Sequence, residues 1–132
     1  MYAKDLMIND WVIRRGVPEE PMRLYDMKAS SGIAYLDQDG RGVTEKFENI
    51  EPITLTNKIL EKNSFLKVEA IEYPYHGVGI SFLYRITPEG LRIFVQNACV
   101  GGPTCTMIKT CKYVHEVQHM IKMCDIEKSF VL

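Results

Sequence analysis

Short alternating runs of apolar and polar residues fill the first third of the chain. They cover residues 10–14, 22–28, 33–36 and 43–47, and Gly, Pro, Ser or Asp residues separate them. Alternation with a period of two is typical of half-buried strands. Residues 37–40 (DQDG) predict a tight turn, because Asp and Gly tolerate left-handed backbone. The pattern therefore predicts a small antiparallel barrel or curled sheet over residues 1–52.

The rest of the chain mixes helical and strand patterns. Thr56 is a suitable N-cap for a two-turn helix over 57–62, which Asn63 and Ser64 would end. Strands are predicted at 66–73, 79–86, 91–99 and 104–109, with a tight turn at 87–90. The last helix, about 112–124, carries its apolar residues on one side, and 129–132 could add an edge strand. We expect an α+β fold with subdomains 1–52 and 53–132 packed as one compact unit.

Composition fits one ordinary domain. The chain has 132 residues, of which 46% are hydrophobic and 25% charged, and its net charge is −1. Residues 1–51 hold 7 Lys+Arg and 10 Asp+Glu, a net of −3. This balance argues against nucleic-acid binding driven by bulk charge. Because Asp5, Asn9 and Asp10 interrupt the apolar N-terminal residues, we expect no secretory signal, no membrane segment and a cytoplasmic protein.

The cysteines give no metal-binding spacing. Cys99, Cys105, Cys111 and Cys124 include no C-x2-C pair, and free thiols are expected in a reducing compartment. Cys111 precedes the last helix, where a helix N-terminus can lower a thiol pKa. A reactive thiol and a structural residue are both open interpretations, and no His can be placed beside it; His76 lies in a predicted loop.

Residues 115–119 (HEVQH) match the zinc-protease pattern H-E-x-x-H. His115 and His119 would bind Zn²⁺ and Glu116 would act as general base. On the predicted helix, however, both His point away from the apolar stripe, and only Asp125 and Glu127 follow as acidic third ligands. We expect a solvated helix face with two exposed His; adventitious metal or a pH-sensitive surface stays open. The sequence therefore assigns no catalytic residue, no metal ligand and no cofactor.

Aromatic and basic residues of the first half give a second candidate. Trp11 could belong to the core or line a peptide or nucleic-acid groove. The Tyr residues that could add an aromatic surface are Tyr25, Tyr35, Tyr73, Tyr75 and Tyr84. A basic patch could combine Arg14, Arg15, Arg23 and Lys28, but Glu19 and Glu20 between them favour a solvated mixed surface.

Three stretches resemble known proteins. Residues 5–12 (DLMINDWV) are similar to the opening of small SH3-like barrels. Residues 53–65 (ITLTNKILEKNSF) and 112–118 (KYVHEVQ) resemble an uncharacterised family of small proteins from gut bacteria and their mobile elements. The resemblance implies an SH3-like barrel followed by an α/β unit, with no established activity. It also implies that H-E-x-x-H is incidental, because the family commonly has another residue, often Asn, at the position of His119.

The function expected from these observations is a non-enzymatic binding or adaptor module with a protein or nucleic-acid partner. Two alternatives remain: a zinc-dependent hydrolase that uses His115, Glu116 and His119, and a nucleic-acid-binding accessory protein of a mobile element.

Overall fold

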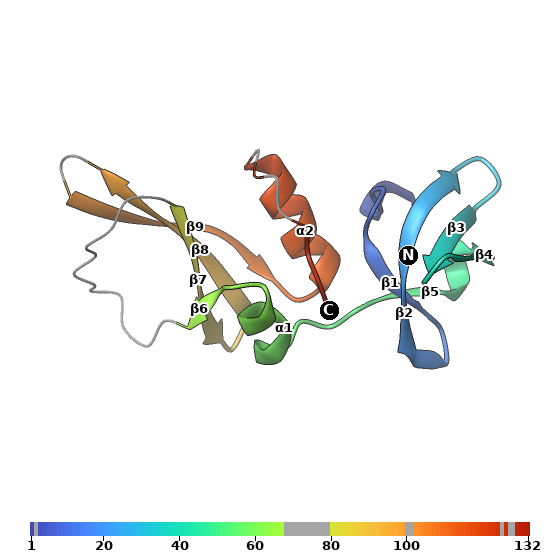
Figure 1. The fold of residues 1–132 in the computed structure, drawn as a ribbon, viewed down its shortest axis with the longest axis horizontal. Helices are drawn as coiled ribbons and strands as arrows, with labels where there is room; N and C mark the ends of the chain where they lie inside the picture. The colour runs from blue at the N-terminus through green and yellow to red at the C-terminus, as the bar shows by residue number, and fades with distance from the viewer. Residues whose placement is uncertain (2, 68–79, 100–101, 125, 127–128) are drawn as a thin grey trace. The chain divides into compact units, whose positions relative to one another are not determined.

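The computed structural model describes residues 1, 3–67, 80–99, 102–124, 126 and 129–132. It confirms a mixed α+β fold with mostly antiparallel sheets (Figure 1). The chain divides into two compact units. The first contains residues Met1–Thr54 and Tyr113–His119, and the second contains Leu55–Lys112 and Met120–Leu132.

A five-stranded antiparallel sheet forms the first unit, with strand order β4-β3-β2-β1-β5. Its elements are η1 (Ala3–Asp5), β1 (Trp11–Arg14), β2 (Val17–Lys28), β3 (Ile33–Gln38), β4 (Arg41–Lys46), η2 (Phe47–Asn49) and β5 (Ile50–Pro52). Among the described residues β4 and β5 are edges of an open sheet, so of the two predicted forms, barrel or curled sheet, the barrel is wrong. Most of the Gly- and Pro-containing segment between the predicted runs 10–14 and 22–28 is strand, because β2 already begins at Val17 and Pro21 pairs with Ile13.

Alternation along these strands separates the core from the outer face of the sheet. Val12, Met22, Leu24 and Leu36 are fully buried on the inner face. The remaining buried members of this core are Leu6, Ala34, Phe47 and Ile50. The β3–β4 turn forms as predicted: Asp39 and Gly40 have φ of 49° and 86°, the left-handed pair that a two-residue hairpin needs.

The second unit contains a four-stranded sheet of order β6-β7-β8-β9. Its elements are α1 (Asn57–Lys62), β6 (Leu66–Lys67), β7 (Ile80–Thr87), β8 (Gly90–Cys99) and β9 (Gly102–Cys111). β6 runs parallel to β7, whereas the other pairs are antiparallel. The predicted helix 57–62 is confirmed: the Thr56 hydroxyl accepts a hydrogen bond from the Ile59 N–H (3.3 Å), and Ser64 follows with φ 65°. Most of the predicted strand 66–73 lies outside the described residues.

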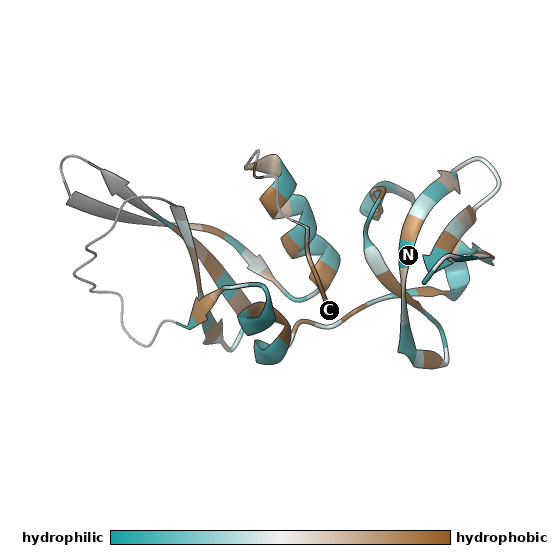
Figure 2. Cartoon of the chain, in the orientation of Figure 1, coloured by the Kyte–Doolittle hydropathy of each residue, from teal (hydrophilic) through white to brown (hydrophobic). Residues whose placement is uncertain are grey.

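The helix α2 (Val114–Met123) is slightly shorter than predicted and contributes residues to both units. Hydrophobic and hydrophilic residues alternate around its surface (Figure 2). Residues 129–132 form no strand, although Phe130 is buried. Within the described part of the chain, no helix is long and apolar enough to cross a membrane.

Candidate functional site

Of the two His residues of the H-E-x-x-H motif, His115 is buried and His119 is half-buried, so the expectation of two exposed His is wrong. His115 is only 7% exposed, and the side chain of His119 is 21% exposed. Both lie in the first unit, where the His119 Nε2 is 2.9 and 2.8 Å from the two carboxylate oxygens of Asp10. Asp10 is itself buried, at 2% exposure. The polar side of α2 is therefore a packed surface in this unit.

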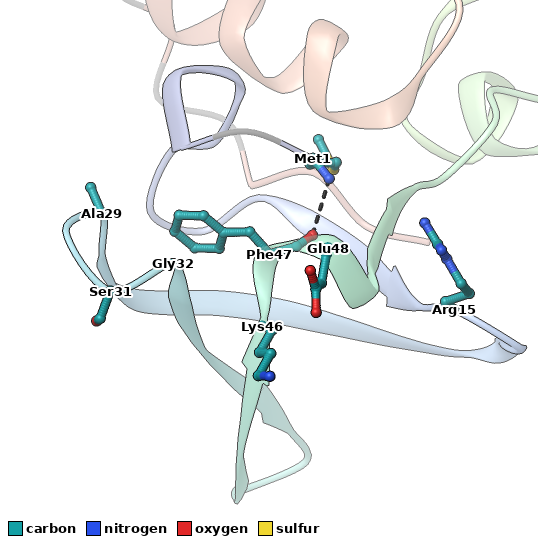
Figure 3. Close-up of a pocket in the computed structure, with 8 residues that line it drawn as sticks. All are labelled: Met1, Arg15, Ala29, Ser31, Gly32, Lys46, Phe47 and Glu48. Carbon is teal, nitrogen blue, oxygen red and sulfur yellow. Dashed lines mark hydrogen bonds between the residues drawn. The ribbon is translucent and has the colours of Figure 1, made fainter.

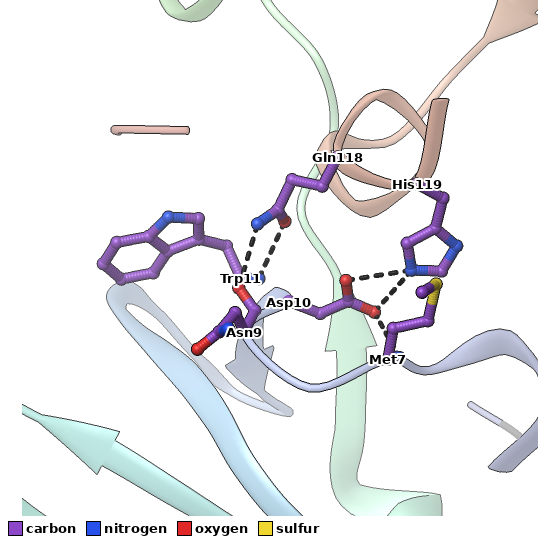
Figure 4. A network of polar contacts seen from close by, with 6 residues as sticks. All are labelled: Met7, Asn9, Asp10, Trp11, Gln118 and His119. Carbon is purple, nitrogen blue, oxygen red and sulfur yellow. Dashed lines mark hydrogen bonds and ion pairs between the residues drawn. The ribbon is translucent and has the colours of Figure 1, made fainter. Parts of the chain in front are cut away.

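Asp10 is held by a tight local turn at the start of β1 (Figure 4). Its carboxylate accepts a hydrogen bond from the Met7 backbone N–H (2.7 Å), and its own N–H donates to the Met7 carbonyl oxygen (3.1 Å). Asn9, inside this turn, has φ 77°, a left-handed conformation that Asn tolerates better than most residues. The turn therefore aims a buried carboxylate at α2 before the strand begins.

Gln118 joins α2 to the same segment. Its Nε2 donates to the Asn9 carbonyl oxygen, and its Oε1 accepts from the Trp11 backbone N–H, both at 2.9 Å. The amide thus satisfies a backbone acceptor and a backbone donor on either side of Asp10 (Figure 4). The stretches 5–12 and 112–118, singled out by the resemblance, contact each other through these bonds.

The other two motif residues also have structural roles. Glu116 Oε2 accepts a hydrogen bond from the Tyr113 backbone N–H (3.1 Å), the return half of a capping box at the helix start. The His115 ring stacks on Tyr113, with ring centroids 5.9 Å apart, and meets the edge of His119 at 5.5 Å. Burial lowers the pKa of His115 below its ordinary 6.5, and the nearby Asp10 carboxylate offsets part of this effect. Burial of His115 therefore disfavours the protonated form of its ring.

This arrangement supports packing and charge-assisted hydrogen bonding. Among the residues that the structure describes, no three His, Cys, Asp or Glu side chains are grouped so that they could hold a metal ion. The Nε2 of His119, which a zinc ligand would offer to the metal, faces Asp10 instead. Asp125 and Glu127, the predicted third ligands, lie outside the described residues.

Cys111, the cysteine that the sequence offered as a reactive thiol, is inaccessible in the structure. Cys111 is fully buried at the end of β9, and Cys124 is exposed. A thiol that acts as a nucleophile needs access to its substrate, which burial denies to Cys111. Cys99 and Cys105 have no described side chains, and His76 lies outside the described residues, as do Tyr73 and Tyr75.

Aromatic residues gather instead on the outer face of the N-terminal sheet. Strand pairing aligns Trp11, Arg23, Asp37 and Gly42 in one row across β1, β2, β3 and β4. The Arg23 guanidinium carbon lies over the Trp11 ring, 5.0 Å from its centroid. Trp11 is partly buried here rather than in the core.

The next two rows extend this face. A bulge in β2 places Tyr25 and Asp26 opposite Tyr35, which pairs with Thr44 of β4. The Tyr25 and Tyr35 rings are 6.2 Å apart, and Tyr25 is 50% exposed. A further row contains Lys28, Ile33 and Lys46. We call these three rows, from Trp11 to Lys46, the aromatic face. Tyr84 is not part of it, because it is buried in the second unit.

Gly42 leaves room for the Tyr25 side chain within the aromatic face. A Cβ at this position would lie 3.3 Å from the Tyr25 hydroxyl, closer than most side-chain contacts. The tyrosine thus reaches across β3 to the edge strand β4. A larger residue at position 42 would have to displace it.

A shallow hollow of about 760 Å³ lies at the end of the same sheet (Figure 3). The turn between β2 and β3 lines one side, and Phe47 and Glu48 of η2 line another. Lys46 is shared between this hollow and the aromatic face, whereas Arg15 in its wall is paired with Glu51 (3.1 Å). Phe47 is the one aromatic residue in the described lining of this hollow, so the hollow adds no second set of aromatic residues.

Sequence reasoning identified Trp11, Tyr25, Tyr35, Arg23 and Lys28 as candidates but could not determine which way they face. It missed the hydrogen bonds that join Asp10 to His119 and Gln118 to Asn9 and Trp11, residues more than 100 positions apart in the chain.

Comparison with known proteins gives no further identification: no family model, curated protein or solved structure matches this chain. The fold and site define an α+β protein with an open N-terminal sheet that carries an aromatic outer face.

Proposed function

We propose that this protein is a non-enzymatic binding module and that the aromatic face is its ligand surface. The observation that carries the proposal is the alignment of Trp11, Tyr25 and Tyr35 with Arg23 on one solvent-facing side of a sheet. The opposite side of the sheet already supplies the core, so these rings are not needed there. Aromatic residues contribute large contact areas with little loss of side-chain entropy, and exposed clusters of them commonly mark binding sites.

No observation favours the zinc-hydrolase alternative over this proposal. His119 bonds to Asp10, Glu116 caps α2, and His115 is packed against Tyr113. Each residue of the motif is thus already used by the fold of the first unit.

The proposal also includes an SH3-like fold for the first unit and a cellular context for the protein. The strand order β4-β3-β2-β1-β5, with the short helix η2 before the last strand, supports an SH3-like first unit. We infer from the sequence resemblance that the protein acts in the bacterial cytoplasm, in the context of a mobile element.

A paired selection tests the proposal. A displayed random-peptide pool and a random single-stranded oligonucleotide pool are each selected on the wild-type chain and counter-selected on a Tyr25→Ser/Tyr35→Ser variant. We expect at least one pool to enrich ligands that bind the wild type and not the variant, because the substitutions remove one exposed and one half-buried ring from the outer face and leave the core unchanged. Enrichment of neither pool, with the variant folded by circular dichroism, would contradict the proposal.

A further inference from the structure

Two arginines of the first unit that lie outside the aromatic face are paired with carboxylates. Arg14 pairs with Glu20 at 3.2 Å, and Arg15 pairs with Glu51 at 3.1 Å. Within the described residues, neither Arg23, Lys28 nor Lys46 has a carboxylate within ion-pair distance of its side chain. Arg23 lies over Trp11, and the two lysines are exposed in the row beside the tyrosines. The three rows thus hold three basic and two acidic side chains, a net charge of +1, and within the described residues the three cations form no ion pair.

Most acidic residues of positions 1–51 lie outside the aromatic face. Of the 10 Asp and Glu in positions 1–51, only Asp26 and Asp37 are in the three rows of the aromatic face. One oxygen of Asp26 already accepts a hydrogen bond from the Met27 backbone N–H at 2.8 Å. The net charge of −3 in residues 1–51 therefore does not describe the local charge of this surface.

Resting on the proposed function, we infer that the aromatic face binds single-stranded nucleic acid. Trp11, Tyr25 and Tyr35 stack on bases, while Arg23, Lys28 and Lys46 contact phosphates. Stacking on aromatic side chains together with a positive surface is the general way in which single strands are bound without strong sequence preference. Acidic peptides would satisfy the cations but rarely supply flat rings, and in a duplex the base faces are already stacked on one another.

The single Trp of the chain provides the assay, because Trp11 lies on the proposed surface. The full-length protein is titrated with oligo-dT and oligo-rU, and Trp11 fluorescence is followed. We expect quenching at about 20 mM salt, and with three phosphate contacts the affinity should fall on the order of 100-fold for a tenfold increase in salt.

Variants are compared by the anisotropy of a labelled oligonucleotide. Tyr25→Ala is expected to weaken binding about tenfold by removing one stacked base. Arg23→Gln should weaken binding and reduce the salt slope. Arg15→Gln is the matched control: it removes the same charge from the same unit, but from a residue paired with Glu51 outside the three rows. Its affinity should stay within about twofold of the wild type.

Three results would overturn the inference. The first is no binding of either oligonucleotide at low salt. The second is binding that Tyr25→Ala and Arg23→Gln leave unchanged, which would place the nucleic acid on another surface. The third is enrichment of peptides alone in the paired selection, which would refute a nucleic-acid ligand while the binding-module proposal stands. Failure of both pools would instead refute the proposed function itself.

Discussion

Replacement of Asp10 by Ala should destabilise the first unit substantially. Asp10 is 2% exposed, and its carboxylate is the acceptor for the Met7 N–H at 2.7 Å and for His119 Nε2 at 2.8 Å. The substitution removes both bonds and leaves a backbone N–H and a ring N–H without their acceptor. Buried groups without a partner cost more than the net value of the bond that they lose.

The magnitude follows from the exposure of the two partners. A hydrogen bond to a charged group contributes about 1.5–3 kcal/mol, and breaking a fully buried ion pair costs about 3–5 kcal/mol. Because the His119 side chain is 21% exposed, water can replace part of its interaction. We therefore expect a loss of about 2–4 kcal/mol in the free energy of unfolding for Asp10→Ala. Asp10→Asn keeps an acceptor for Met7 and should lose about 1–2 kcal/mol.

A double-mutant cycle of Asp10→Ala and His119→Ala measures the pair directly. Urea unfolding is followed by Trp11 fluorescence and by circular dichroism. We expect a coupling energy of about 1–3 kcal/mol. The control is Arg15→Gln, which removes an ion pair whose side chains are 66% and 43% exposed and should change stability by less than about 1 kcal/mol. A coupling below about 0.5 kcal/mol at unchanged m-value would refute the interpretation of His119 as a structural partner.

Four further outcomes are expected. Gln118→Ala should cost about 1–2 kcal/mol by removing two hydrogen bonds to backbone, and unchanged urea stability would contradict this. Thr56→Ala should cost about 1 kcal/mol through loss of the α1 N-cap, and a loss no larger than that of Lys58→Ala would argue against the cap. Because burial lowers the pKa of His115, the unfolded state binds a proton more readily than the folded state does, so stability should fall as pH drops below about 6.5. His115→Phe should flatten this fall, and a pH profile identical to that of the wild type would refute the role of His115. Mass spectrometry of untagged protein should find well under one zinc per chain, whereas stoichiometric zinc lost in His119→Asn would reverse our assignment of the motif.

Local signals predicted the turns and the first helix well. Asp39 and Gly40 adopt the left-handed backbone that their residue types favour, and Thr56 caps α1 through its own hydroxyl. These features depend on neighbours only a few residues away, so the sequence contains their cause. The alternation of Val12, Met22 and Leu24 with Trp11 and Arg23 likewise determined the two opposite faces of the sheet. It did not determine which ligand binds the outer face.

The open edges of the N-terminal sheet and the environment of α2 depend on contacts between residues that are far apart in the sequence. A helical pattern separates apolar from polar positions, and it assigns the polar side to solvent unless a partner is known. Here the partners of His119 and Gln118 are Asp10, Asn9 and Trp11, which lie more than 100 residues earlier in the chain. The sequence by itself determined the elements and their turns, because short-range sterics and hydrogen bonds set them. Only the tertiary structure decided that the polar side of α2 is packed, because a buried carboxylate and a backbone segment satisfy it there.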